Sequence, residues 1–235
     1  MTTLKYQERF KTLEGVFDEN TFRNLFELES RNVFEELLSP LKIGKESNVF
    51  TAKKGTKDII VKIYRVQNCD FKRMYHYIRT DPRYLYLNNH RRQIIFAWTQ
   101  REYQNLHKAQ KAGVHCPKPL TVRENILVEE MIGAPALPLK DTPPKNPRKF
   151  LQEILVEVQK LYQGGMVHGD LSAFNILNWD EKPYLIDFSQ STLTKTPNSV
   201  EMLKRDLTNI AQYFKKLGIK ANPEEMFLKV TSQQS

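Results

Sequence analysis

The chain has 235 residues, of which 40% are hydrophobic and 27% charged, and this balance excludes a largely disordered protein. It has no run of eighteen apolar residues and only two cysteines, which exclude a transmembrane helix and a disulfide framework. The start lacks a secretory apolar stretch, so we expect a cytoplasmic protein without a membrane partner. The net charge is +9, and residues 65–111 hold ten basic and three acidic residues. This basic block favours an anionic partner such as phosphate or nucleic acid.

Residues 1–40 carry a net negative charge, and their apolar side chains recur at three- and four-residue spacing from Phe22 to Leu38. The spacing predicts two short amphipathic helices, the second capped by Ser30 and ended by Pro40. A DNA-reading helix-turn-helix is the alternative, but its phosphate contacts need the positive charge that this stretch lacks.

β-like patterns follow the N-terminal stretch. A first run at 43–53 leads through a turn to a strong strand at 59–64, which is rich in β-branched residues. Residues 65–90 give no clear assignment, whereas 91–111 predict a helix that stops at Gly113.

The second half of the chain is richer in helical patterns. We predict, in chain order, a hairpin within 121–131, a Pro-rich loop at 134–149, a helix over 151–162, two short strands at 176–177 and 184–186, and a last helix over about 200–217. A β-rich half therefore precedes a helix-rich half, with the Pro-rich loop as the seam.

The residues best suited to chemistry lie between His168 and Asp187. Asp170 is followed five residues later by Asn175, and Asp187 ends an apolar strand twelve residues further on. Phosphotransferases build metal-nucleotide sites from such a set, because Asn and Asp oxygens are hard ligands for Mg²⁺ or Mn²⁺. The first Asp is then free to accept a proton from an attacking hydroxyl group. A chance grouping in a turn-rich stretch is the alternative, and the apolar flanks argue against it.

Lys62 lies inside the predicted strand at 59–64, where its ammonium group needs an anionic partner. Nucleotide phosphates would supply one. The alternative is an edge-strand lysine that points to solvent. On the predicted helix at 91–111, Glu102 is the best candidate for an ion pair with Lys62.

The segment before that strand has the place of a phosphate-covering loop. It aligns through Val49 with the pattern G-x-G-x-x-G-x-V, although it keeps only the middle glycine, as Gly44. Lys45 and Ser47 offer a charge and a hydroxyl donor there. An ordinary turn is the alternative interpretation.

Together these motifs resemble the protein kinase superfamily. The segments GKESNVF at 44–50, IVKIY at 60–64, VHGDLSAFNIL at 167–177 and LIDFSQ at 185–190 resemble the RIO family of atypical kinases, and its Rio-one subfamily in particular. The resemblance implies a bilobal α+β protein-kinase-like fold, with a β-rich N-lobe and a truncated helical C-lobe. It divides the chain into an N-terminal helical extension at 1–40, an N-lobe with hinge at 41–133 and a C-lobe at 134–235.

The resemblance also implies chemical roles. Asp170 would be the catalytic base, and Asn175 and Asp187 would hold Mg²⁺. In this family the counterpart of Asp187 is also held to accept the γ-phosphate of ATP as a transient aspartyl-phosphate. One departure from ordinary kinases is Ser189, which stands where they have glycine.

The nucleotide contacts follow from the same resemblance. Lys62 would anchor the phosphates of ATP, and backbone groups of Glu130 and Ile132 would bind adenine. Residues around 68–90 correspond to a loop that bears autophosphorylation sites, with Thr80 as a candidate hydroxyl group.

On this resemblance we expect an autophosphorylating Ser/Thr kinase and ATPase that acts in maturation of the small ribosomal subunit. The subunit precursor or its RNA would be the partner of the basic block 65–111, and the protein substrate is unknown. Small-molecule phosphotransferases of the aminoglycoside kinase type share H-G-D-L-x-x-x-N and I-D-F, but they usually carry a large helical substrate domain. A non-catalytic ATP-binding assembly factor is disfavoured because Lys62, Asp170, Asn175 and Asp187 are all present.

Overall fold

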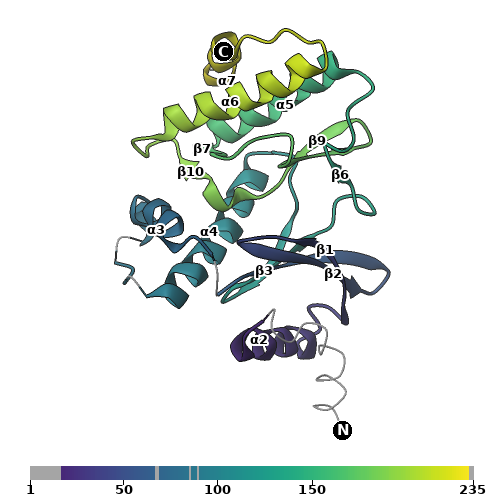
Figure 1. The fold of residues 1–235 in the computed structure, drawn as a ribbon, viewed down its shortest axis with the longest axis vertical. Coiled ribbons are helices and arrows are strands. Elements are labelled where there is room, and N and C mark those ends of the chain that lie inside the picture. The colour runs from purple at the N-terminus through teal and green to yellow at the C-terminus, as the bar shows by residue number, and fades with distance from the viewer. Residues whose placement is uncertain (1–16, 67–68, 85, 89, 233–235) are drawn as a thin grey trace.

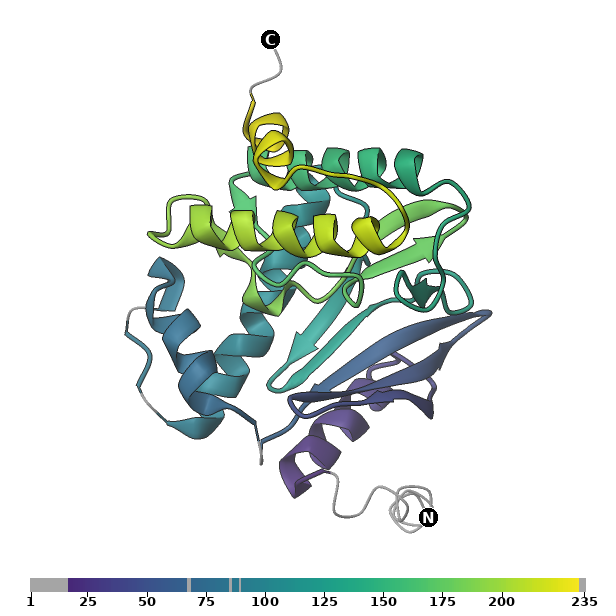
Figure 2. The same ribbon diagram turned by 45° about the horizontal axis from the view of Figure 1, so that its top comes forward.

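The computed structural model describes residues 17–66, 69–84, 86–88 and 90–232. Figures 1 and 2 show a β-sheet on one side of the molecule and a layer of helices on the other. The expected order, a β-rich half before a helix-rich half, is confirmed. The first sixteen residues of the expected N-terminal extension lie outside the described part.

The β-rich half is an antiparallel sheet with the strand order β1-β2-β3-β5-β4. Its strands are β1 (Glu36–Ile43), β2 (Ser47–Lys54), β3 (Lys57–Tyr64), β4 (Pro119–Arg123) and β5 (Ile126–Glu130). The central strand β3 is rich in β-branched residues, and its last six residues are buried, which explains its strong pattern. The predicted hairpin is confirmed as β4 and β5.

The helix α2 (Glu19–Ser30) covers the face of the sheet that looks away from the helical layer (Figures 1 and 2). Its N-terminus is capped by Asp18, whose carboxylate accepts a hydrogen bond from the backbone N–H of Thr21 at 2.9 Å. Leu25 and Leu28 pack into the core of the sheet. The first expected helix is thus confirmed.

The second expected helix is wrong, because residues 36–43 form β1 at the edge of the sheet. Phe34 is buried in the sheet core, so the spacing that resembled a helical stripe serves a strand instead. Pro40 lies at a register irregularity of β1, a position where an edge strand tolerates a missing N–H. Ser30 is the last residue of α2 and caps no following helix, and the expected boundary at residue 40 falls inside β1.

Between β3 and β4 the chain is largely helical. It forms α3 (Phe71–Arg79), a short 3₁₀ turn η2 (Pro82–Tyr84) and α4 (Arg91–Lys111). The helix α4 confirms the prediction for that range, whereas α3 lies in the part that gave no assignment. Trp98 of α4 and Met74 of α3 belong to one apolar cluster, which holds the two helices together.

The helical half continues with several short strands. Its elements are β6 (Leu137–Pro138), α5 (Pro147–Gln163), β7 (Met166–Val167), β8 (Ile176–Trp179), β9 (Lys182–Leu185), the 3₁₀ turn η3 (Phe188–Gln190), β10 (Thr192–Leu193), α6 (Ser199–Lys216) and α7 (Pro223–Thr231). Both helices and both short strands expected here are confirmed, and α7 is additional. Within the part of the chain that the structure describes, no helix is both long and apolar enough to cross a membrane.

Candidate active site

A buried lysine lies at the centre of the site. The strand β3 places Lys62 between Val49 of β2 and Leu127 of β5. Its Nζ atom lies 2.8 Å from Oε1 of Glu102 and 3.0 Å from Oδ1 of Asp187. Burial by itself lowers the pKa of Lys62, but the two carboxylates overcome this effect and hold the pKa well above its usual value. Lys62 is therefore a fixed cation, and the predicted ion pair with Glu102 is present in the structure.

Glu102 supports Lys62 from α4. Its side chain is fully buried, and its second carboxylate oxygen accepts a hydrogen bond from the hydroxyl group of Tyr64. Since both oxygens have a partner, the buried carboxylate is satisfied and holds the ammonium group in one place. Tyr64, which ends the same strand as Lys62, is not among the site residues that the sequence predicts.

Asp187 reaches the lysine from the turn after β9. Its backbone has a left-handed conformation, with φ of 64°. The hydroxyl group of Ser189 donates to Oδ1 at 2.8 Å, so Oδ1 is shared between Ser189 and Lys62. Burial favours the protonated form, yet the ammonium group of Lys62 and this hydrogen bond hold the pKa of Asp187 well below its usual value. Oδ2 accepts no hydrogen bond from any described residue, and the side chain is 38% exposed.

Asp170 belongs to the loop that links β7 to β8. Asn175 donates from Nδ2 to the carbonyl oxygen of Asp170 at 2.8 Å and to its Oδ2 at 3.3 Å. Burial and the negative charge of Asp187 raise the pKa of Asp170, which is the shift that a proton acceptor needs. The motif thus brings both residues together, as the sequence predicts.

The backbone of this loop is fixed by α6. Asp206 accepts hydrogen bonds from the N–H groups of Gly169 at 2.7 Å and Leu171 at 2.9 Å, on either side of Asp170. Burial raises the pKa of Asp206 to about 7 in spite of these two donors. Asp206 is not among the site residues that the sequence predicts.

His168, the first residue of the motif, is a structural histidine. A ring nitrogen lies 3.0 Å from the carbonyl oxygen of Ile186, next to Asp187 in the chain. Burial lowers the pKa of His168 to about 4, so its ring is neutral at neutral pH and its N–H group can donate a hydrogen bond to that carbonyl oxygen. His168 therefore ties the loop of Asp170 to the strand before Asp187.

These groups meet in a cleft of about 810 Å³, a volume typical of small-molecule sites. Eight of the ten predicted site residues line it: Lys45, Ser47, Val49, Lys62, Glu130, Ile132, Asn175 and Asp187. Of the other two, Glu102 is buried behind Lys62, and Asp170 is half-buried and contacts Asn175. The cleft also contains Glu129, which sequence reasoning missed. Burial and the charge of Glu102 raise the pKa of Glu129 to about 8.

One glycine of the expected phosphate loop has a clear structural reason. The N–H group of Gly44 donates to the carbonyl oxygen of Ser47 at 3.0 Å, which closes the turn between β1 and β2. A Cβ atom at Gly44 would lie 2.7 Å from that oxygen, so a larger residue would open the turn. The turn brings Lys45 and Ser47 to the cleft.

The donor atoms fit a hard cation such as Mg²⁺. Oδ2 of Asp187 lacks a protein partner among the described residues, and the hydrogen bonds of Asn175 leave its side-chain oxygen available. In the described ranges, no group of three or more His, Cys, Asp or Glu residues could hold a metal ion. A cation here would therefore take its other ligands from phosphate groups and water.

The chain is similar in sequence to known proteins of one family. The RIO domain family matches residues 48–226. The RIO-type serine/threonine-protein kinase Rio1 of Haloferax volcanii is 35% identical over 235 residues, which cover 98% of this chain and 81% of that protein. The Rio1 of Methanocaldococcus jannaschii is 39% identical over 234 residues, with shares of 98% and 80%.

A solved structure resembles the fold. The Rio2 kinase of Chaetomium thermophilum, in an ADP/Mg²⁺-phosphoaspartate complex, superposes with a TM-score of 0.71 at 20% identity. The match covers 91% of this chain and 67% of that one. The expected bilobal kinase-like architecture is thereby confirmed.

Proposed function

Because the chain belongs to the RIO family of atypical serine/threonine-protein kinases, we propose that its cleft binds ATP with Mg²⁺ or Mn²⁺ for phosphoryl transfer. The observation that carries this proposal is the position of Lys62, held between two carboxylates at the wall of the cleft. A cation fixed there complements the phosphate groups of a nucleotide. Family membership favours a protein kinase over a small-molecule phosphotransferase.

The other residues of the cleft would orient the nucleotide. Lys45 and Ser47 would contact phosphate oxygens from the turn between β1 and β2, and Val49 would pack against the base. Glu130, the last residue of β5, and Ile132, two residues further on, would bind adenine through backbone groups. Asn175 and Asp187 would hold the cation, which would neutralise charge on the phosphates.

Two aspartates would carry the chemistry. Asp170, with its raised pKa, would accept the proton of a substrate hydroxyl group as that oxygen attacks the γ-phosphorus. Asp187, with its lowered pKa, would be an ionised nucleophile. Its Oδ2 would bond to the γ-phosphorus while the bond to the bridging oxygen breaks and ADP leaves. Water would later hydrolyse the aspartyl-phosphate, which gives an ATPase cycle.

Labelling with γ-labelled ATP tests this proposal. We expect incorporated label in the wild type and none in Lys62→Ala. Label that hydroxylamine releases indicates an acyl-phosphate, and its loss in Asp187→Asn assigns it to that residue. Stable label on Ser or Thr indicates autophosphorylation, for which Thr80, exposed at the end of α3, is the proposed acceptor. A wild-type protein that neither binds ATP nor becomes labelled would refute the proposal.

We also propose a ribosomal partner for the basic block 65–111, the precursor of the small subunit or its RNA. Part of the positive charge of this block is neutralised within the protein, because Arg83 and Arg101 both form ion pairs with Asp81. The exposed basic residues that support an RNA-binding face are on α3 and at the start of α4: Lys72, Arg73, Arg79, Arg91 and Arg92.

Salt-dependent binding of a small-subunit rRNA fragment tests this partner. In Lys72→Gln/Arg79→Gln we expect weaker binding and a salt slope smaller by about two, since each basic residue that contacts a phosphate contributes about one unit. The exposed Arg148 of α5 supplies the control substitution Arg148→Gln. An unchanged slope in the double variant would exclude this face as the RNA contact.

A further inference from the structure

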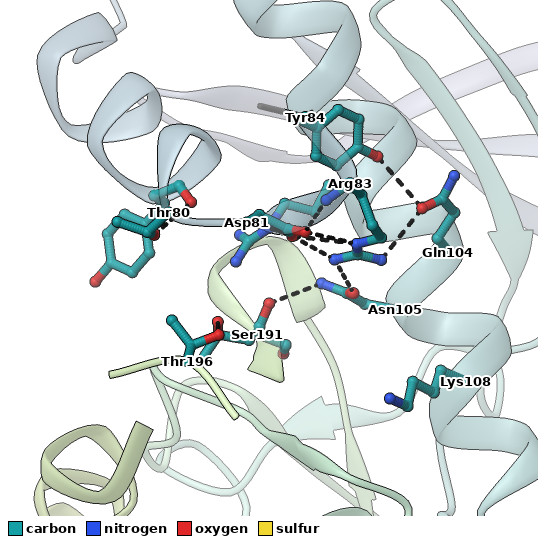
Figure 3. A network of polar contacts seen from close by, with 12 residues as sticks. Thr80, Asp81, Arg83, Tyr84, Gln104, Asn105, Lys108, Ser191 and Thr196 are labelled. Atoms are coloured by element: carbon teal, nitrogen blue, oxygen red, sulfur yellow. Dashed lines mark hydrogen bonds and ion pairs between the residues drawn. The ribbon is translucent and has the colours of Figure 1, made fainter. Parts of the chain in front are cut away.

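A buried carboxylate lies between α3 and α4. Asp81 is 2% exposed and is held by Arg83, whose Nε and Nη2 atoms lie 2.9 Å and 2.6 Å from its two oxygens. Arg101 of α4 donates from Nε to Oδ2 of Asp81 at 2.9 Å. Figure 3 shows this network between the turn after α3 and the side of α4. The Asp81 carboxylate thus neutralises a fully buried arginine.

The same arginine reaches the turn that follows Asp187. Its Nη1 donates to the carbonyl oxygen of Ser189 at 2.5 Å. One turn further along α4, Asn105 donates to the carbonyl oxygens of Phe188 and Ser191, both at 2.9 Å. Figure 3 shows the contact with Ser191. Two side chains of α4 therefore hold the backbone of this turn at three carbonyl groups, those of Phe188, Ser189 and Ser191.

This turn sets the position of the Asp187 carboxylate. The hydroxyl group of Ser189 is bonded to Oδ1 of Asp187, so a shift of Ser189 moves that oxygen. Arg101 is also the neighbour in sequence of Glu102, which holds Lys62 from the other side. The adjacent residues Arg101 and Glu102 of α4 thus support the two sides of one ion pair. Glu102 holds Lys62 directly, and Arg101 holds the turn that carries Asp187.

We propose that Arg101 and Asp81 are positioning residues, through which the segment after α3 fixes the Asp187 carboxylate without contact to the nucleotide. Among the described residues, Asp81 is the one carboxylate that pairs with Arg101. A buried guanidinium group that loses its anion is strongly destabilised, so Arg101 keeps its place only while Asp81 is docked. The inference rests on the proposed function, because it concerns the residue assigned to the cation and the γ-phosphate.

The paired variant Asp81→Leu/Arg101→Met tests the proposal. Replacement of a buried ion pair by apolar side chains often preserves the fold, whereas the contact with Ser189 is lost. We expect a melting temperature within a few degrees of the wild type, about a tenfold rise in the Mg²⁺ concentration for half-maximal labelling, and unchanged affinity for a fluorescent ATP analogue in EDTA. Amide hydrogen exchange in 187–191 of the nucleotide-free variant should be faster than in the wild type.

A second variant covers a failure of the first to fold. Arg101→Lys keeps a cation for Asp81 but lacks the second arm that reaches Ser189, so the same rise in the Mg²⁺ requirement is expected. Arg148→Met, an exposed arginine of α5, is the matched control and should behave as the wild type. Wild-type Mg²⁺ dependence and exchange in either folded variant would overturn the proposal. A wild type without ATP-dependent labelling would instead refute the proposed function.

Discussion

The two aspartates of the candidate site are held in contrasting ways. Asp187 is fixed by charged and hydroxyl groups from the sheet side and from its own turn, and its pKa falls. Asp170 is fixed by an amide group, and its loop is fixed through backbone N–H groups by α6, while its pKa rises. Two nearby carboxylates whose pKa values are pushed apart are suited to different tasks. The contrast supports the proposed roles, in which Asp187 acts as an anion and Asp170 accepts a proton.

Removing the negative charge of Asp187 should have the largest effect on labelling. In Asp187→Asn, Lys62 loses one of its two carboxylates and the cation loses a charged ligand, so we expect labelling from γ-labelled ATP to fall by about 10³-fold or more. Near-wild-type labelling in this variant would contradict the role of Asp187 and remove the contrast.

Removing the proton acceptor should have the next largest effect. For Asp170→Asn we expect about a 10²- to 10⁴-fold loss in the rate of Ser/Thr labelling, with ATP affinity within a few-fold of the wild type. The difference from Asp187→Asn is the Mg²⁺ dependence of nucleotide binding, which Asp170→Asn should preserve. A loss of Mg²⁺-dependent binding would show that the two carboxylates share one task.

The loop support is expected to matter less than the aspartates themselves. Asp206→Asn leaves one oxygen for two N–H donors, so it should reduce the free energy of unfolding by about 1–3 kcal/mol and labelling by about tenfold. The pKa of Asp206 is about 7 in the folded protein, above its usual value of 3.8, so between these pH values the folded protein retains a proton that the unfolded chain releases. The free energy of unfolding of the wild type therefore falls as the pH rises from about 4 to 7. The penalty of the substitution should therefore be smaller at pH 8 than at pH 5, as denaturant titrations at both values can check.

The smallest effect concerns Glu129, the third carboxyl group near Lys62. Its pKa of about 8 exceeds the usual value of 4.5, so the unfolded chain releases a proton that the folded protein retains between these pH values. The contribution to stability is full below pH 4.5 and is lost as the pH rises through 8. Glu129→Gln removes this dependence and should be more stable than the wild type by about 1–2 kcal/mol at pH 8.5, because a half-buried carboxyl group keeps part of its hydration.

Melting temperatures of wild type and Glu129→Gln across pH 5–9 measure this difference. It should widen steadily up to about pH 8 and then stay constant. A difference that does not depend on pH would show that Glu129 is already ionised in the folded protein at low pH.

Many residues of the candidate site could be predicted because they belong to short sequence motifs. Lys62, Asp170, Asn175 and Asp187 were found from residue type and spacing, and the structure places them at one cleft or directly beside it. Their individual roles stay predictions until the variants are measured. The fold class was accessible through the resemblance that these motifs carry. The β-branched run of β3 and the helical stripe of α5 marked single elements of the fold.

The rest depended on contacts between distant residues. Arg101 counted as one more basic residue of the 65–111 block, although it is fully buried against Asp81 and Ser189, 20 and 88 positions away. The range of β1 was predicted to be helical because its apolar residues and those just before it recur at three- and four-residue spacing. The structure shows that Phe34, just before β1, packs into the core of the sheet instead. In both cases the local sequence pattern was compatible with two structures, and contacts with distant residues decided between them.

The edge strand β1 also bears on self-association. Leu41 and Ile43 are 49% and 60% exposed, so this margin of the sheet offers apolar side chains beside backbone groups that could pair with another chain. Pro40 lacks an N–H group and interrupts the register of β1, which makes the margin a poor template for a second strand. The residue that the sequence pattern marked as a helix stop therefore disfavours the pairing of β1 with a strand of another chain.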